Sequence, residues 1–119
     1  MSTGELVAVD LSDEERTLLR CGLSEWGGPA HPSEPLATAM GFLGTNDFYA
    51  QRQRIRAVLA DGDSLSMEDW RRALVATEIV FASDVVGSGL DWPTTTGLSD
   101  ENTIRTLRGL QRKILSTRH

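Results

Sequence analysis

Two acidic residues on one predicted helix are the side chains with the strongest case for chemistry. Glu78 shares a helical sector with Leu74, Phe81 and Val85. A carboxylate there must be paired, hydrogen-bonded or protonated, because burying it without a partner costs several kcal/mol. Asp84 falls in the last predicted turn, where the helix dipole disfavours an anion by roughly 0.3–1 kcal/mol. The two side chains point about 120° apart, so they do not form an acid–base pair.

Each of these acids has a structural and a functional interpretation. In the structural one, Glu78 pairs with an arginine of the last helix and Asp84 hydrogen-bonds to the backbone of residues 87–98. In the functional one, either acid faces a pocket and contacts a ligand or partner, because residues that break local rules concentrate at functional sites. The structural interpretation is favoured, and it predicts that Glu78→Ala weakens folding by leaving a buried arginine unpaired. The arginines available form a basic stripe of Arg105, Arg108 and Arg112.

Two tryptophans are the remaining candidates for a binding surface. Trp26 precedes Gly27-Gly28-Pro29, and Trp92 lies between Asp91 and Pro93. Tryptophan is enriched at interface hot spots, so either residue could be an exposed anchor for a partner. Packing over the core is the favoured role for both.

Metal and nucleophile motifs are missing from the sequence. A structural zinc site takes about four Cys or His ligands, and this chain offers only Cys21, His31 and His119. No Gly-x-Ser-x-Gly elbow is present, and Gly87-Ser88-Gly89 follows a helix rather than a strand. We therefore predict no catalytic residue, no metal and no cofactor.

The element that must position Glu78 and Asp84 is a helix from about Met67 to Val86. Ser66 is its predicted N-cap, with Asp69 at the capping-box position. Gly87 is its predicted stop. Because this helix is apolar nearly all round, it is expected in the middle of the fold.

The other elements expected are helices beginning near Ser12, Ser33, Thr45 and Ser99. Residues 87–98 are read as a long loop, a kind of segment that is often functional. Residues 1–10 are read as a flexible arm. The sequence therefore predicts an all-α fold with about five helices in a compact orthogonal or bundle-like arrangement, as a single domain over residues 1–119.

Composition narrows the classes of function. The chain has 119 residues and a net charge of -5, which argues against general nucleic-acid binding. No stretch approaches the roughly 20 apolar residues of a membrane span. A lone cysteine and a start without a signal-peptide pattern indicate a cytoplasmic protein.

One stretch of the sequence resembles small helical proteins of high-GC actinobacteria that have no known activity. The resemblance rests on Trp70-Arg71-Arg72-Ala73-Leu74, on the run from Thr77 to Gly87, and on Asp91-Trp92 and Leu107-Arg108. It implies no function for this chain.

The leading hypothesis is a non-catalytic protein–protein interaction module, with an immunity-type or antitoxin-like binder as its most concrete version. A small acidic domain suits that role, because complementary charge speeds the capture of a basic partner. The alternative is a small-ligand-binding or catalytic domain with a pocket near Glu78, Asp84 and residues 87–98. A homodimer through the last helix or an exposed tryptophan is a third alternative.

Overall fold

The computed structural model describes residues 5–28 and 30–117, and within them the fold is all-α apart from one two-residue strand pair. Six α-helices and one 3-10 turn follow one another, so the predicted fold class is confirmed, with one helix more than expected. The elements are β1 (Leu6–Val7), α1 (Asp13–Glu25), α2 (Glu34–Ala39), α3 (Thr45–Ala60), β2 (Leu65–Ser66), α4 (Met67–Ala82), η1 (Gly89–Asp91), α5 (Trp92–Thr96) and α6 (Asp100–Ser116).

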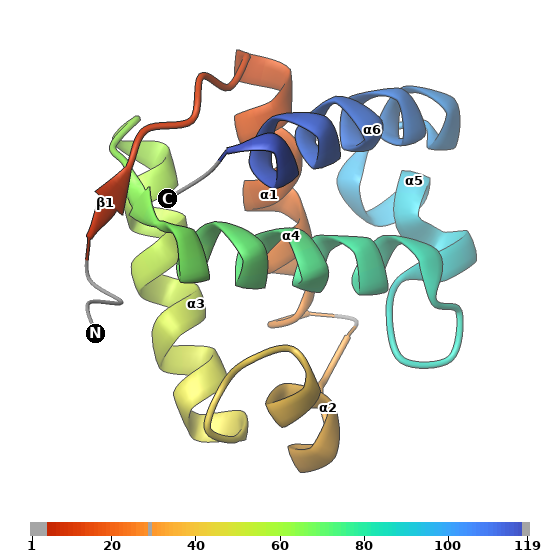
Figure 1. Cartoon of the computed structure of the whole chain (residues 1–119). Helices are drawn as coiled ribbons and strands as arrows, with labels where there is room; N and C mark the ends of the chain where they lie inside the picture. Colours follow the sequence, from red (N-terminus) through yellow and green to blue (C-terminus); the bar gives the residue numbers. More distant parts are fainter. Residues whose placement is uncertain (1–4, 29, 118–119) are drawn as a thin grey trace.

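The core is built around α1 and α4. Helix α1 packs against α4, α3 and α6, and α4 in turn packs against α6. Figure 1 shows α1 behind α4, with α3 and α6 on different sides of the pair and α2 below it. The central position predicted for the helix that starts at Met67 is confirmed, and α1 shares that position.

Helix starts follow the sequence closely. Ser12 caps α1 in a full capping box with Glu15. Ser66 caps α4 by accepting a hydrogen bond from the backbone N–H of Asp69. These caps satisfy backbone N–H groups that the first helical turn leaves without partners.

The end of α4 differs from the prediction. The helix stops at Ala82 rather than at Val86, because Ser83 takes an extended conformation. The Ser83 hydroxyl accepts hydrogen bonds from the backbone N–H groups of Val85 and Val86. The chain then folds back, and the N–H of Ser88 donates to the Val80 carbonyl at 2.7 Å. A Cβ on Gly87 would lie 2.6 Å from that carbonyl oxygen, so the return depends on a glycine.

The expected flexible arm is wrong for residues 5–10. Leu6 pairs with Ser66 and Val7 with Leu65 in an antiparallel ladder. Val7 and Val9 are buried, and Trp70 donates its indole N–H to the Val7 carbonyl at 2.8 Å. The segment stays in place because it contributes apolar side chains and one carbonyl to the core. Residues 1–4 lie outside the described residues.

No helix among the described residues is long and apolar enough to cross a membrane.

Candidate binding site

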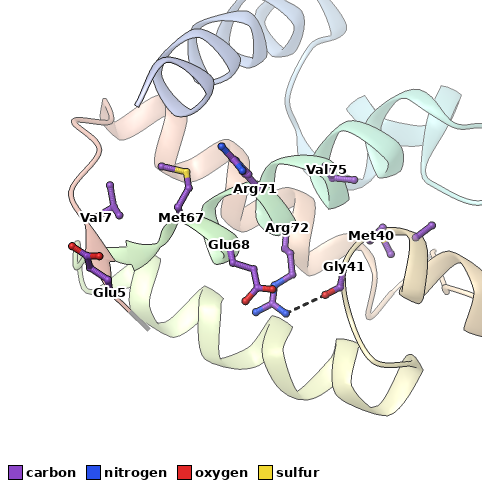
Figure 2. Close-up of a pocket in the computed structure, with 10 residues that line it drawn as sticks. Glu5, Val7, Met40, Gly41, Met67, Glu68, Arg71, Arg72 and Val75 are labelled. Carbon is purple, nitrogen blue, oxygen red and sulfur yellow. Dashed lines mark hydrogen bonds between the residues drawn. The ribbon is translucent and has the colours of Figure 1, made fainter. Parts of the chain in front are cut away.

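One cavity of the described structure opens beside the first half of α4. It encloses about 430 Å³ between β1, the start of α4 and the turn that follows α2 (Figure 2). Such a volume falls within the range of small-molecule and side-chain pockets, roughly 300–1,000 Å³. The lining residues are Glu5, Val7, Ala39, Met40, Gly41, Met67, Glu68, Arg71, Arg72 and Val75.

The floor of this cavity is apolar and adaptable. Val7 and Met40 are buried, while Met67 and Val75 are half-buried on the α4 wall. Methionine has three rotatable bonds and a polarizable sulfur, so it adapts to irregular apolar groups. The floor can therefore take an aliphatic side chain or the apolar part of a ligand.

The mouth of the cavity carries charge. Glu5, Glu68 and Arg71 are exposed, and none of them forms an ion pair with a described residue. Arg72 also lines the cavity, but Asp69 is its ion-pair partner. The unpaired groups are thus two carboxylates and one guanidinium.

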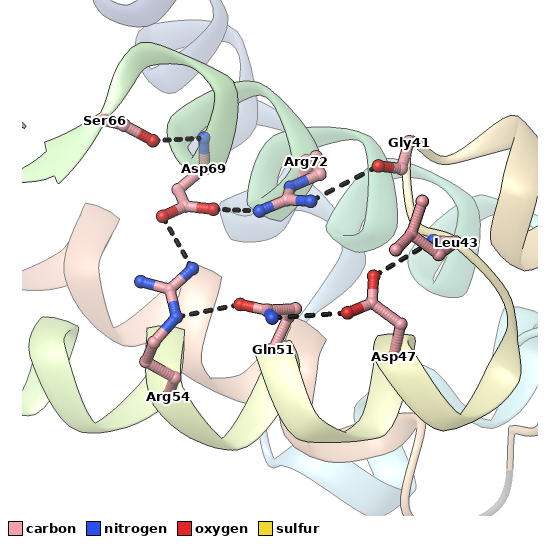
Figure 3. Close-up of polar contacts among 8 residues, drawn as sticks. All are labelled: Gly41, Leu43, Asp47, Gln51, Arg54, Ser66, Asp69 and Arg72. Carbon is pink, nitrogen blue, oxygen red and sulfur yellow. Dashed lines mark hydrogen bonds and ion pairs between the residues drawn. The ribbon is translucent and has the colours of Figure 1, made fainter. Parts of the chain in front are cut away.

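Asp69 fixes the wall that contains Arg72 (Figure 3). Its carboxylate accepts hydrogen bonds from Arg72 on the same helix and from Arg54 on α3, the latter at 2.7 Å. Arg72 also donates to the Gly41 carbonyl at 3.3 Å and lies over the Phe42 ring, 4.7 Å from its centroid. One carboxylate therefore joins α4, α3 and the turn after α2.

The turn itself depends on a glycine. Gly41 has φ of 104°, a left-handed value that favours glycine, and a Cβ there would lie 3.1 Å from Arg72. The glycine lets the backbone carbonyl approach the guanidinium closely. It therefore sets one edge of the cavity.

A second chain of hydrogen bonds supports the same wall from α3. Arg54 Nε donates to Gln51 at 2.8 Å, and Gln51 donates to Asp47 at 3.2 Å. The other Asp47 oxygen accepts from the backbone N–H of Leu43 at 3.0 Å. The loop between α2 and α3 is thus connected to Asp69 through side chains (Figure 3).

The charge state of Asp69 follows from these contacts. Burial raises the pKa of Asp69, but the hydrogen bonds and charges of Arg72 and Arg54 outweigh that effect. The net pKa lies below the ordinary value of 3.8, so the carboxylate is ionised at neutral pH. Asp69 is therefore a structural anion, and its carboxylate does not turn back to complete a capping box.

The structure places Glu78 differently from the sequence prediction. Glu78 is half-buried and accepts a hydrogen bond at 2.6 Å from the side-chain amide of Gln111. The predicted arginine partner is wrong, since no described arginine forms an ion pair with Glu78. Arg108 is connected to it indirectly, by donating to the side-chain amide oxygen of Gln111 at 2.8 Å.

Asp84 takes the structural role that was favoured for it. Its carboxylate accepts from the backbone N–H of Leu90 at 3.0 Å, which confirms the expected bond to residues 87–98. Those residues are wrongly read as a long loop, because they fold into η1 and α5. Val85 is 92% exposed, so the prediction that it shares a buried sector with Glu78 is also wrong. Helix α4 ends at Ala82, before the chain reaches Val85.

Both candidate tryptophans are fully buried. Trp26 donates its indole N–H to the Ala76 carbonyl at 3.0 Å and packs edge-on against Phe48. Trp92 donates to the Thr103 hydroxyl at 2.9 Å. The packing role favoured for both is confirmed, because neither ring reaches the surface.

The basic stripe of α6 is on the surface and forms no ion pair with Asp84. Arg105, Arg108 and Arg112 are exposed, and Arg105 pairs with Glu101 at 3.3 Å on its own helix. The predicted pocket at Glu78, Asp84 and residues 87–98 stays a prediction. Both acids are hydrogen-bonded within the fold, and neither lines the cavity at β1 and α4.

A buried carboxylate on α1 gave no clear signal in the sequence. Glu25 is buried, and one of its oxygens accepts from the hydroxyls of Ser88 at 2.6 Å and Thr95 at 2.5 Å. Glu25 therefore joins the end of α1 to η1 and α5.

The Cys21 thiol on α1 is a poor nucleophile. Burial and the Glu25 charge raise the pKa of this thiol, although the Arg20 charge lowers it.

No group of three or more His, Cys, Asp or Glu side chains in residues 5–28 and 30–117 is arranged to hold a metal ion. Comparisons of the chain with protein-family models, with curated proteins and with solved structures find no match. The resemblance to actinobacterial helical proteins stays a prediction. The site is therefore interpreted from its own geometry.

Proposed function

We propose that the protein is a non-catalytic protein–protein interaction module and that the cavity at β1 and α4 receives part of the partner. An immunity-type or antitoxin-like binder is the most concrete version of this role. The proposal places the protein in the cytoplasm, where a lone cysteine stays reduced.

The observation that carries the proposal is the combination of lining and support in the cavity. Its floor is apolar, its mouth carries unpaired charges of both signs, and the wall beside it is fixed by Asp69. Of the described residues that line it, none carries a hydroxyl, thiol or imidazole. An apolar centre with a polar rim on a rigid support is the usual anatomy of a protein interface.

The favoured partner is basic overall. The chain carries a net charge of -5. Complementary charge raises association rates and suppresses wrong partners. The small-ligand alternative gains no support from Glu78 and Asp84, because both are hydrogen-bonded within the fold.

Site-specific photocrosslinking tests this proposal. A photoreactive residue at Ala39, which is exposed and lines the cavity, should give one defined protein adduct in the cells that produce the protein. The same residue at Thr94, exposed on α5 and outside the cavity lining, is the matched control and should not give that adduct. The same set of adducts from both positions, or no protein adduct from Ala39, would count against an interface at the cavity.

A further inference from the structure

A second cavity, the α1 cavity, shares no lining residue with the cavity at β1 and α4. It encloses about 320 Å³, and five of the residues that line it belong to α1. The others come from α3 and α5, which Figure 1 shows on either side of α1. A cavity of this volume can hold a small metabolite, since small-molecule sites start at roughly 300 Å³.

The lining of the α1 cavity is polar. Four lining residues carry hydroxyl groups, two are arginines, and the remaining two are Glu25 and Cys21. None of the described residues that line it is aliphatic or aromatic. Such a surface gives a lipid chain or a nucleobase nothing to pack against, so the ligand that fits it is small and polar.

Glu25 is a buried carboxylate without a counter-charge among the described residues. It is 8% exposed, and no described residue forms an ion pair with it. The hydroxyls of Ser88 and Thr95 both donate to one oxygen, Oε1. No described residue donates to the other oxygen, Oε2, which is not enclosed by protein atoms. Because a buried carboxylate is costly without a partner, Oε2 favours a cationic hydrogen-bond donor in the cavity.

Arg20 and Arg56 contribute the opposite charge to the same cavity. Arg20 is exposed on α1, and Arg56 is half-buried on α3. Neither forms an ion pair with a described residue, and Arg56 donates to the uncharged Gln53 side chain at 2.8 Å. The lining therefore holds two guanidiniums and one carboxylate. Guanidinium groups bind carboxylates well, because their N–H donors match the two carboxylate oxygens.

From this set of charges we infer that the α1 cavity binds a free acidic α-amino acid. The ammonium group of the ligand donates to Oε2 of Glu25, and its two carboxylates face Arg20 and Arg56. A metal cation would meet two like charges and only one carboxylate, whereas a dicarboxylate without an amine would leave Oε2 without a donor. The inference goes beyond the proposed protein interface and does not depend on it, because the two cavities share no residue.

Three ligands of closely matched size test the inference. L-glutamate is titrated into the protein at constant pH and ionic strength, and the backbone amide resonances of Cys21, Ser24 and Thr96 are followed by NMR. We expect saturable shifts in the millimolar range. Glutarate lacks the ammonium group and L-glutamine lacks one carboxylate, so each should bind about threefold to tenfold more weakly. Equal or tighter binding of either compound, or no saturable shift with L-glutamate, would overturn the inference.

Two arginine variants separate the cavity from the general electrostatic field of the protein. Arg20→Gln should weaken L-glutamate binding about threefold to tenfold, because it removes one guanidinium of the lining. Arg112→Gln changes the net charge equally at an exposed position of α6 outside this cavity, and it should leave binding nearly unchanged. Equal weakening by both variants, or none by Arg20→Gln, would contradict the assignment.

Glu25→Gln tests the contact with the ammonium group. This variant should bind L-glutamate and glutarate equally, because the charged acceptor for the ammonium is lost. A preference for L-glutamate that persists in Glu25→Gln would place the ammonium elsewhere and overturn the inference. Glu25 also accepts two hydrogen bonds within the fold, so the arginine pair provides the test if Glu25→Gln does not fold.

Discussion

Gly22 on α1 faces Thr77 on α4 so closely that no larger residue fits at that position. A Cβ on Gly22 would lie 2.7 Å from the Thr77 Cγ2 atom and closer still to its hydroxyl oxygen. Both residues are buried, and the Thr77 hydroxyl donates to the Ala73 carbonyl at 2.8 Å, which fixes its rotamer. The two central helices therefore cross where one of them lacks a side chain.

Gly22→Ala is expected to destabilise the protein although alanine is the better helix former. Helix propensity favours alanine by about 1 kcal/mol. The steric conflict with Thr77 costs more, because overpacking a tight core typically costs 1–3 kcal/mol or above. We expect a net loss of about 1–2 kcal/mol in the free energy of unfolding, measured by urea denaturation.

Two further variants make this prediction specific. Gly28→Ala is a matched control, because a Cβ there would meet only the Glu25 carbonyl oxygen at 3.8 Å, and its effect should stay within about 0.5 kcal/mol. Combining Gly22→Ala with Thr77→Ala should cost less than the sum of the two single changes. Simple additivity would show that the helices do not touch at this point.

The sequence predicts the helices better than it predicts how they end and meet. The N-caps Ser12 and Ser66 and the central place of α4 follow from local patterns that need no tertiary information. The stop at Ala82 was missed because Gly87 acts through a close approach to Val80 rather than as a helix cap. Gly22 gave no signal either, since its role depends on Thr77 on another helix.

Removing the Asp69 charge should lower stability at neutral pH by about 2–4 kcal/mol, between the values for exposed and buried ion pairs. Asp69→Asn keeps the shape of the side chain but loses its charge towards Arg54 and Arg72. Because the folded pKa of Asp69 lies below the unfolded one, its contribution is complete above about pH 4 and disappears as pH falls through the folded pKa.

Urea denaturation at several pH values from 7 to 3 measures this contribution. The difference in unfolding free energy between wild type and Asp69→Asn should shrink as the pH falls below 3.8. Arg72→Gln should cost more than Arg54→Gln, because the Arg72 side chain is 14% exposed and that of Arg54 is 47% exposed. A difference that stays constant with pH would mean that the Asp69 charge is not what stabilises the site.

The hydrogen bonds from Ser88 and Thr95 to Glu25 should stabilise the packing of η1 and α5 against α1. Thr95→Val removes one of the two hydroxyls that donate to the buried carboxylate, so we expect a loss of about 1.5–3 kcal/mol. Amide hydrogen exchange in residues 89–96 should rise more than elsewhere. Thr94→Val, at an exposed neighbouring position, is the control and should change neither quantity measurably. Unchanged exchange in Thr95→Val would show that the cluster does not hold this segment.

The candidate site is harder to predict than the fold, because its residues contact partners that are far away in the sequence. Asp69 looked like a capping residue, and nothing local reveals that Arg54 reaches it from α3. The cavity also needs Val7 and Glu5, which belong to a segment read as a flexible arm. Asp84 breaks a local rule, but its carboxylate forms a hydrogen bond within the fold and does not line this cavity.

Glu78→Ala should cost about 1 kcal/mol, less than expected for a carboxylate that pairs with a buried arginine. Glu78 is half-buried, and its partner is the uncharged Gln111 amide, so the change leaves no unpaired buried charge. A double-mutant cycle with Gln111→Ala should give a coupling of about 0.5–1 kcal/mol. Arg112→Ala, on the exposed side of α6, is the control and should not couple to Glu78. A loss above about 3 kcal/mol for Glu78→Ala, or coupling to Arg112 instead of Gln111, would mean that an arginine of α6 pairs with Glu78 in solution.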